Sequence, residues 1–308
     1  MAYDIIGDIH GECDALEALL IKLDYSVVDG TWRHPNRKVI FLGDFIDRGP
    51  QQKAVLDVVM PMVNQGTALA VMGNHEFNAL AFATRKSDDS GWLRPRSKKN
   101  IKQHAAFLDE YHDRPAARNA ALEFFNSLPL WLDLEGLRIV HACWDETSIK
   151  RIAEKFGGAA LTEELLQLGS TQGTQEFTDV ETLLKGKELP LPEGVVFHDK
   201  DGIERRDIRV KWWDKTAKTY QDAFLGPDTV RDKIPAKLTE GSHLAPDSEN
   251  GSPVFFGHYW MTGSPASLAD NVACLDYSVA RPGGALAAYR WSGETSLDDA
   301  NFVWVTKP

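Results

Sequence analysis

Three short motifs in the first quarter of the chain constrain its fold more than any other feature. Each contains glycine and side chains that can bind metal ions, and each directly follows an apolar run. In order, they are Gly7-Asp8-Ile9-His10-Gly11, Gly43-Asp44-Phe45-Ile46-Asp47-Arg48-Gly49 and Gly73-Asn74-His75-Glu76. The apolar runs are typical of buried strands, so each motif is predicted to begin the loop that leaves a strand.

The spacing of these motifs predicts a parallel α/β sheet. Successive motifs lie roughly 30 residues or slightly more apart, which is the length of a strand, a helix and a return strand. The strands are predicted over 3–6, 38–42 and 68–72, and the helices over 14–23 and 52–63. Open α/β sheets bind ligands at the carboxyl ends of their strands, so the three motifs are expected to meet at one edge.

Later strands are expected to complete the same domain. They are predicted over 137–140, 253–256, 271–275, 285–291 and 302–305. The segment 145–250 interrupts this pattern with a predicted helix over 162–168 and a β-hairpin over 195–213. We therefore interpret residues 1–308 as a single domain with an inserted cap over 145–250.

Charge and composition narrow the classes of partner. The chain has a formal net charge of −11, which disfavours general binding to nucleic acid or to an anionic membrane. A small phosphorylated substrate remains compatible, because local charges hold it. Three widely spaced cysteines predict reduced thiols. We recognise neither a signal peptide nor an apolar stretch of about 18 residues, so the cytoplasm is the expected location.

The motifs offer the ligands of a metal site. Asp8 and His10 are two residues apart in extended chain, so their side chains point the same way. The carboxylate of Asp44 has two oxygens and can bridge two cations about 3.5–4 Å apart. Asn74 can add a neutral oxygen. The alternatives are a surface Asp-x-His pair and, for Asp44, an N-cap of the following helix.

Two histidines can contribute to a second ion. His141 and His258 each follow a predicted strand, which is the local geometry of the three motifs, although either alone could be a histidine at the margin of the core. Two aspartates and two divalent cations would leave the site with a charge of roughly +2, which favours a phosphate. Mixed nitrogen and oxygen ligation suits Mn, Fe, Zn or Co better than Ca or Mg.

His75, Asp47 and Arg48 are predicted to act on the substrate. Adjacent residues on a turn diverge, so His75 is expected to be free for proton transfer and not to share the ion of Asn74. A carboxylate from Asp47 would favour the charged imidazole that a general acid needs. The guanidinium of Arg48 matches the geometry of phosphate. The alternatives are a structural hydrogen bond for His75 and a solvated position for Arg48. Glu76 is interpreted as structural.

Together, the motifs resemble those of the calcineurin-like metallophosphoesterase superfamily, and within it the phosphoprotein phosphatase branch. That branch carries GDxHG, GDxxDRG and GNHE, which stand here as GDIHG, GDFIDRG and GNHE. The resemblance covers residues 3–80 closely. The middle of the chain looks more like bacterial phosphatases and dinucleoside tetraphosphatases. The resemblance implies an α/β (α+β) fold, a four-layer β-sandwich flanked by helices, with an inserted cap and two metal ions at its edge.

The resemblance also implies a role for each site residue. Two ligand sets would share one carboxylate: Asp8, His10 and Asp44 for the first ion, and Asp44, Asn74, His141 and His258 for the second. His75 would be the general acid, oriented by Asp47, and both Arg48 and Asn74 would face the bound phosphate.

Two positions are less well defined by the resemblance. The family has a second phosphate-binding arginine before the last histidine, and we favour Arg209 over Arg205 and Arg206. The family also has two glycines after the fourth-strand histidine, where this chain has Ala142-Cys143. That departure alters the wall beside the site and leaves the ligand itself unchanged.

The expected function is metal-dependent hydrolysis of phosphoric esters. A hydroxide bridging two divalent ions would attack phosphorus, and His75 would protonate the leaving oxygen. A Ser/Thr-type phosphomonoesterase acting on phosphoproteins is the first interpretation, and a symmetrical dinucleoside tetraphosphatase is the alternative. Four tryptophans could stack a nucleobase or, as we favour, form cap core: Trp144, Trp212, Trp213 and Trp260. An inactive scaffold is a remote alternative, since it would have lost ligands.

Overall fold

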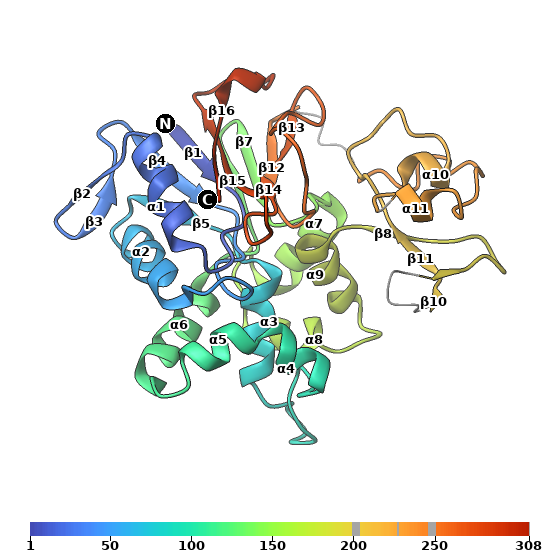
Figure 1. The fold of residues 1–308 in the computed structure, drawn as a ribbon. Helices are drawn as coiled ribbons and strands as arrows, with labels where there is room; N and C mark the ends of the chain where they lie inside the picture. Colours follow the sequence, from blue (N-terminus) through green and yellow to red (C-terminus); the bar gives the residue numbers. More distant parts are fainter. Residues whose placement is uncertain (199–203, 227, 246–250, 308) are drawn as a thin grey trace.

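Two β-sheets packed face to face form the centre of the molecule (Figure 1). The computed structural model describes residues 1–198, 204–226, 228–245 and 251–307. The first sheet has the order β14 (Asp276–Tyr277), β15 (Ala285–Trp291), β1 (Ala2–Ile6), β4 (Arg37–Phe41) and β5 (Ala68–Ala70), with β16 (Phe302–Thr306) also paired to β15. The second has the order β13 (Val272–Cys274), β12 (Val254–Phe256), β7 (Leu137–Val140) and β6 (Trp131–Leu134).

Alternation along the central strands builds the two apolar layers. Ile5 and Ile40 point inward and pack with Ile139 and Phe255 of the second sheet. Their neighbour Phe41 points to the other face of the sheet, where the helices cover it. A side-chain period of two therefore fills the space between the sheets and the space beneath the helices from the same strands.

Helices cover both outer faces of the sandwich and the ends of its strands (Figure 1). Beside the first sheet lie α1 (Cys13–Lys22) and α2 (Gln52–Asn64). Next in the chain come α3 (Asn74–Ala83), α4 (Lys98–Gln103), α5 (Ala105–Glu110) and α6 (Pro115–Ser127). Then follow α7 (Glu146–Phe156), α8 (Glu163–Gly169) and α9 (Gln175–Lys185), whose apolar residues join the cluster that also holds Val140 and Phe256.

The predicted βαβ arrangement is confirmed. β1 pairs with β4, and β4 with β5, both in parallel. The predicted helix over 14–23 corresponds to α1, where Leu16, Leu19 and Leu20 are fully buried. Because the three strands run the same way, the three motifs leave the sheet at one edge.

A smaller lobe, formed by residues 187–198, 204–226 and 228–245, lies to one side of the sandwich (Figure 1). It contains β8 (Glu188–Pro190), β9 (Phe197–His198), β10 (Glu204–Arg205), β11 (Asp207–Arg209), α10 (Tyr220–Ala223) and α11 (Asp228–Arg231). Its apolar cluster is separate from the main core and includes Leu189, Ile208 and Phe224. The helices α7–α9 join the main core, as do Trp212 and Trp213 of the lobe. The single domain with a cap over 145–250 stays a prediction.

The predicted hairpin over 195–213 differs from the structure in its second half. β9 pairs with β10 as expected, and the turn that the sequence predicts at 200–202 lies outside the described residues. β11, however, pairs with β8. The reason is packing, because this pairing buries Ile208 against Leu189 in the core of the lobe.

Several short elements were not expected from the sequence, and two examples lie near the ends of the chain. A hairpin of β2 (Ser26–Val28) and β3 (Thr31–Arg33) extends from α1, and a 3-10 helix, η1 (Asp299–Asn301), precedes β16. Within the described ranges, every helix is too short or too polar to cross a membrane.

Candidate dinuclear metal centre and active site

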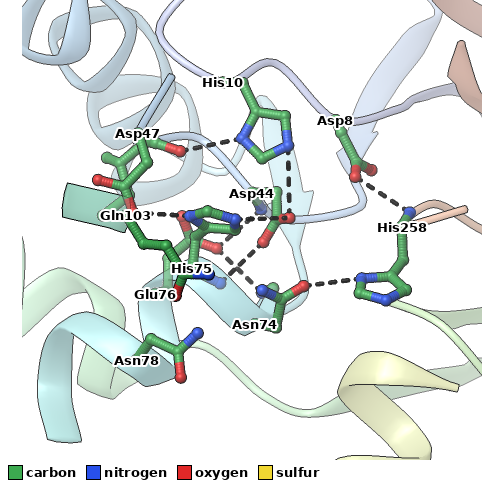
Figure 2. Close-up of polar contacts among 12 residues, drawn as sticks. Asp8, His10, Asp44, Asp47, Asn74, His75, Glu76, Asn78, Gln103 and His258 are labelled. Atoms are coloured by element: carbon green, nitrogen blue, oxygen red, sulfur yellow. Dashed lines mark hydrogen bonds and ion pairs between the residues drawn. The ribbon is translucent and has the colours of Figure 1, made fainter. Parts of the chain in front are cut away.

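The ends of five strands bring the predicted ligands together. Asp8 and His10 follow β1, and Asp44 follows β4, where the backbone N–H of His10 donates to the carbonyl oxygen of Asp44 over 2.8 Å. Asn74 begins α3 directly after β5. In the second sheet, His141 follows β7 and His258 follows β12. Figure 2 shows side chains from both sheets facing one another around Asp44.

The carboxylate of Asp44 lies at the centre of this group. Its Oδ2 is 3.6 Å from Nε2 of His10, 3.4 Å from Nε2 of His141 and 4.0 Å from Nε2 of His75. Burial disfavours its charge, but His141 and then His75 hold the pKa of Asp44 well below its usual range. Conversely, the same carboxylate outweighs burial at His141 and raises the pKa of its imidazole to about 10.

The amide of Asn74 joins the two histidines of the second sheet. Its Oδ1 is 3.2 Å from Nε2 of His141 and 2.8 Å from Nδ1 of His258. Two ligands held about 2.1 Å from one ion lie roughly 3 to 3.5 Å apart. The spacing of these polar atoms is therefore that of neighbouring ligands around a cation.

Three buried polar atoms at the site have no hydrogen-bond partner among the described residues. They are Oδ1 of Asp8, Nε2 of His10 and Nε2 of His258. Burying an unsatisfied polar atom costs about 1–3 kcal/mol, so such a cluster needs a ligand. Two groups of side chains have donor atoms within 4.8 Å of one another, and both include Asp44: His10, Asp44 and His75, and Asp44, His141 and His258. The residues present would fit two cations, with the carboxylate of Asp44 available to both.

Asp8 is the predicted carboxylate ligand that neither group includes. His75 belongs to the first group, whereas Asp8 does not lie within that radius. The Oδ2 of Asp8 instead accepts a hydrogen bond from the backbone N–H of His258 over 3.0 Å, which leaves Oδ1 unpaired. His75 was expected to be free for proton transfer and not to share the ion of Asn74, and its Nε2 lies 4.0 Å from Oδ2 of Asp44. Its role therefore has to be tested by metal content as well as by activity.

Hydrogen bonds on the far side of the imidazoles fix their orientation. Nδ1 of His10 donates to the carbonyl oxygen of Ile46 over 3.0 Å, and Nδ1 of His141 donates to that of Leu42 over 2.7 Å. Metal-binding histidines commonly donate their other ring N–H in this way. Burial also lowers the pKa of His10 to about 3, so its imidazole is neutral, which is the form that binds a metal ion.

The loops that carry these residues have an unusual backbone. Five non-glycine residues of the site have positive φ angles: His10 (49°), Asp44 (51°), Asp47 (68°), Arg48 (74°) and His258 (72°). A non-glycine residue in this region is uncommon, and clusters of such residues occur at functional sites. Contacts from elsewhere in the fold help to hold these conformations.

Glu76 supplies part of that support. Its carboxylate accepts hydrogen bonds from the backbone N–H groups of Asp44 (2.8 Å), Phe45 (2.9 Å) and Gly73 (3.0 Å). It thereby ties the loop after β4 to the start of α3. Gly73 cannot be larger, since a Cβ there would lie 2.3 Å from the backbone nitrogen of Asp44.

Asp47 holds two histidines at the mouth of the site. Its Oδ2 accepts from Nδ1 of His75 over 2.6 Å, as predicted for an orienting carboxylate. Its Oδ1 accepts from Nδ1 of His104 over 3.0 Å. Sequence reasoning missed His104, which is buried and stacked on Phe107 with ring centres 4.9 Å apart. Only the polar stretch around it was visible in the sequence, and that stretch resembles a surface loop.

Arg48 is held by a tryptophan from another part of the chain. Its guanidinium lies 3.7 Å from the ring centre of Trp260, and the guanidinium of Arg281 lies 3.8 Å from the same centre. Two cations at these distances occupy opposite faces of the ring, so Trp260 has no free face for a nucleobase. The other three tryptophans belong to the main core: Trp144, Trp212 and Trp213.

A cavity of about 860 Å³ opens beside His75. Arg48 and Asn74 line it together with Arg205 and Arg209, so the lining does not choose between these two candidates for the second arginine. The Nε of Arg209 is buried and has no hydrogen-bond partner among the described residues. Arg206 instead pairs with Glu204 and is not part of the lining.

A family model matches most of the chain. Residues 1–232 match the model described as calcineurin-like phosphoesterase. The chain belongs to the calcineurin-like phosphoesterase family. This membership confirms the family predicted from the three motifs.

Several curated proteins are similar to part of the chain. One named bis(5'-nucleosyl)-tetraphosphatase PrpE [asymmetrical], from Oceanobacillus iheyensis, is 45% identical over 76 residues, which are 24% of this chain and 30% of that protein. The protein of the same name from Bacillus subtilis is 43% identical over 76 residues, 24% of this chain and 31% of that protein. The matched segment thus spans less than a third of these relatives.

A solved structure is similar over the whole chain. It is a protein serine/threonine phosphatase from Saccharomyces cerevisiae, with a TM-score of 0.50 and 15% identity. The alignment covers 100% of this chain and 81% of that one. At this identity the likeness supports the predicted metallophosphoesterase fold and says nothing of the substrate.

Proposed function

We propose that the protein hydrolyses phosphoric esters with the help of two divalent metal ions. The observation that carries the proposal is the position of Asp44, which is shared by two groups of potential metal ligands. The His75–Asp47 pair and the arginine-lined cavity lie next to it. A binding scaffold would have no need of this combination of strained loops, unpaired ligand atoms and an oriented imidazole.

Six side chains would hold the two ions. The first ion would be bound by Asp8, His10 and Asp44, and the second by Asp44, Asn74, His141 and His258. Mixed nitrogen and oxygen ligation favours Mn, Fe, Zn or Co. When bound, such ions supply positive charge to the phosphate oxygens and make a water molecule a stronger nucleophile at neutral pH.

The residues of the chain would position the substrate and move the proton. Arg48 and Arg209 would hold the phosphate oxygens, and Trp260 keeps the guanidinium of Arg48 in place. Burial opposes a charged His75, but Asp44 and the hydrogen bond to Asp47 raise the pKa of His75 above its usual range. The imidazole would thus carry the proton that the leaving oxygen needs.

The first proposed substrate is a phosphoserine or phosphothreonine ester in a protein. A dinucleoside tetraphosphate is the second, supported by the names of the relatives that match one quarter of the chain. Those names specify asymmetrical cleavage, whereas the sequence interpretation was the symmetrical type. Comparing the hydrolysis of a phosphopeptide and of diadenosine tetraphosphate, with chromatography of the products, separates all three possibilities.

Metal dependence tests the proposal directly. We expect the purified protein to bind two Mn²⁺ ions, to hydrolyse p-nitrophenyl phosphate with Mn²⁺, and to lose activity in a chelator. Restored activity on adding Mn²⁺ back would exclude unfolding as the cause. Full activity in the chelator would overturn the metal-dependent mechanism, and metal binding without any hydrolysis would favour the scaffold.

Removing the charge of Asp47 is expected to change the pH dependence. The carboxylate stabilises the protonated imidazole of His75, so Asp47→Asn should lower that pKa by about one unit or more. Activity that requires protonated His75 falls as pH rises through this pKa, so the alkaline limb of kcat should move to lower pH. A matched control is Asp57→Asn, an exposed carboxylate on α2. An unmoved limb would contradict the pairing.

A further inference from the structure

The cavity beside His75 is strongly basic in a chain that is acidic overall. Its lining includes seven cationic side chains, namely Arg48, Arg94, Lys99, Lys102, Lys185, Arg205 and Arg209. The only carboxylates in the lining are Asp47 and Glu181. The whole chain has a formal net charge of −11. Charge of one sign concentrated in a cavity attracts ligands of the other sign.

On the α4 side of the cavity, carboxylates of the described residues neutralise little of this positive charge. Glu181 pairs with Lys185, and Asp47 is occupied by His75 and His104. On the α4 side, Arg94 donates to neutral amide oxygens, those of Asn78 and Gln103. In the described part of the chain, Lys99 and Lys102 take part in no ion pair.

The arrangement separates these cations into two groups. Arg48 and Arg209 would hold the phosphate that reacts. A second side of the cavity is formed by α4 and the segment before it. We call this side the α4 wall and define it as Arg94, Lys99, Lys102 and Gln103. A cavity of about 860 Å³ is large enough for a ligand much bigger than one phosphate.

We propose that the α4 wall binds further phosphate groups of a substrate in which several phosphates are linked in a chain. This inference rests on the proposed function only for the place of the reacting phosphate. A singly phosphorylated ester would satisfy Arg48 and Arg209 and leave the wall unused. A condensed phosphate chain carries negative charge on each successive unit, so it can contact both groups of cations at once.

Binding of inorganic tripolyphosphate tests the wall without requiring catalysis. Titration calorimetry in a chelator compares tripolyphosphate with orthophosphate on the full chain. We expect Lys99→Gln with Lys102→Gln to weaken tripolyphosphate binding about tenfold, which corresponds to about 1.4 kcal/mol. Orthophosphate binding should change less than twofold. Lys99→Arg with Lys102→Arg keeps the charge and should keep the affinity.

Two nearby lysines provide a matched control. Lys86 and Lys98 are exposed and are not part of the cavity lining, although Lys98 lies on α4 beside Lys99. Lys86→Gln with Lys98→Gln removes the same charge and should leave tripolyphosphate binding within twofold of the unaltered protein. An equal loss in this control, or an equal loss for orthophosphate, would overturn the wall as a specific site.

Turnover separates the wall from the proposed function. The Lys99/Lys102 glutamine variant should lower kcat/KM for diadenosine tetraphosphate about tenfold and leave that for p-nitrophenyl phosphate within twofold. A protein that hydrolyses neither substrate yet shows the difference in tripolyphosphate binding would refute the proposed function and support the wall. A protein that hydrolyses both, with no difference between variants in binding, would refute the wall alone.

Discussion

Replacing Asp44 by asparagine is expected to lower kcat/KM for p-nitrophenyl phosphate at least a thousandfold. Three imidazole nitrogens lie within 4.0 Å of Oδ2 of this carboxylate, and both candidate ligand groups depend on it. An amide carries no charge to join two cations, so the variant should bind fewer than two ions. Metal ions contribute several kcal/mol to catalysis, and each 1.36 kcal/mol is a factor of ten in rate.

Metal analysis and activity assays on the same preparation check this result. Asp57→Asn, exposed on α2, is the control for loss of one carboxylate. The melting temperature in a chelator should show that Asp44→Asn still folds, because its backbone N–H remains bonded to Glu76. If Asp44→Asn binds two ions and keeps substantial activity, the proposed role of Asp44 as a ligand shared by both ions is contradicted.

The strand ends could be predicted from sequence because local features determine them. A short apolar run that ends in glycine and then aspartate is visible within ten residues, and the structure places Asp8 and Asp44 as such runs suggest. Parallel pairing of β1 and β4 then follows from the helix between them. The approach of His141 and His258 was expected from the same local pattern repeated in two later strands.

The surroundings of the site could not be predicted because contacts distant in sequence create them. His104 and Asp47 are 57 positions apart, and their hydrogen bond depends on how α4 and α5 meet the loop after β4. The stacking of Arg48 on Trp260 joins the second motif to a segment near the end of the chain. Neither the periodicity of the sequence nor the spacing of its motifs predicts such long-range contacts. They form only when both sheets and the helices around them are packed.

Replacing His75 by glutamine is expected to affect substrates according to their leaving group. For an alkyl phosphate such as a phosphoserine peptide, kcat should fall by about 10² to 10⁴, the usual contribution of a general acid. For p-nitrophenyl phosphate the loss should be much smaller, because p-nitrophenolate leaves with less need of a proton. Steady-state kinetics on the two substrates measures the difference.

The same variant decides whether His75 acts as a general acid or as a metal ligand. Its Nε2 is 4.0 Å from Asp44, which groups it with His10, while its Nδ1 is bound to Asp47. A general acid can be removed without loss of metal, so His75→Gln should retain two Mn²⁺ ions. A metal ligand cannot, and its removal would slow both substrates equally. Loss of an ion with equal slowing would therefore make His75 a ligand and leave Asp47 without an acid to orient.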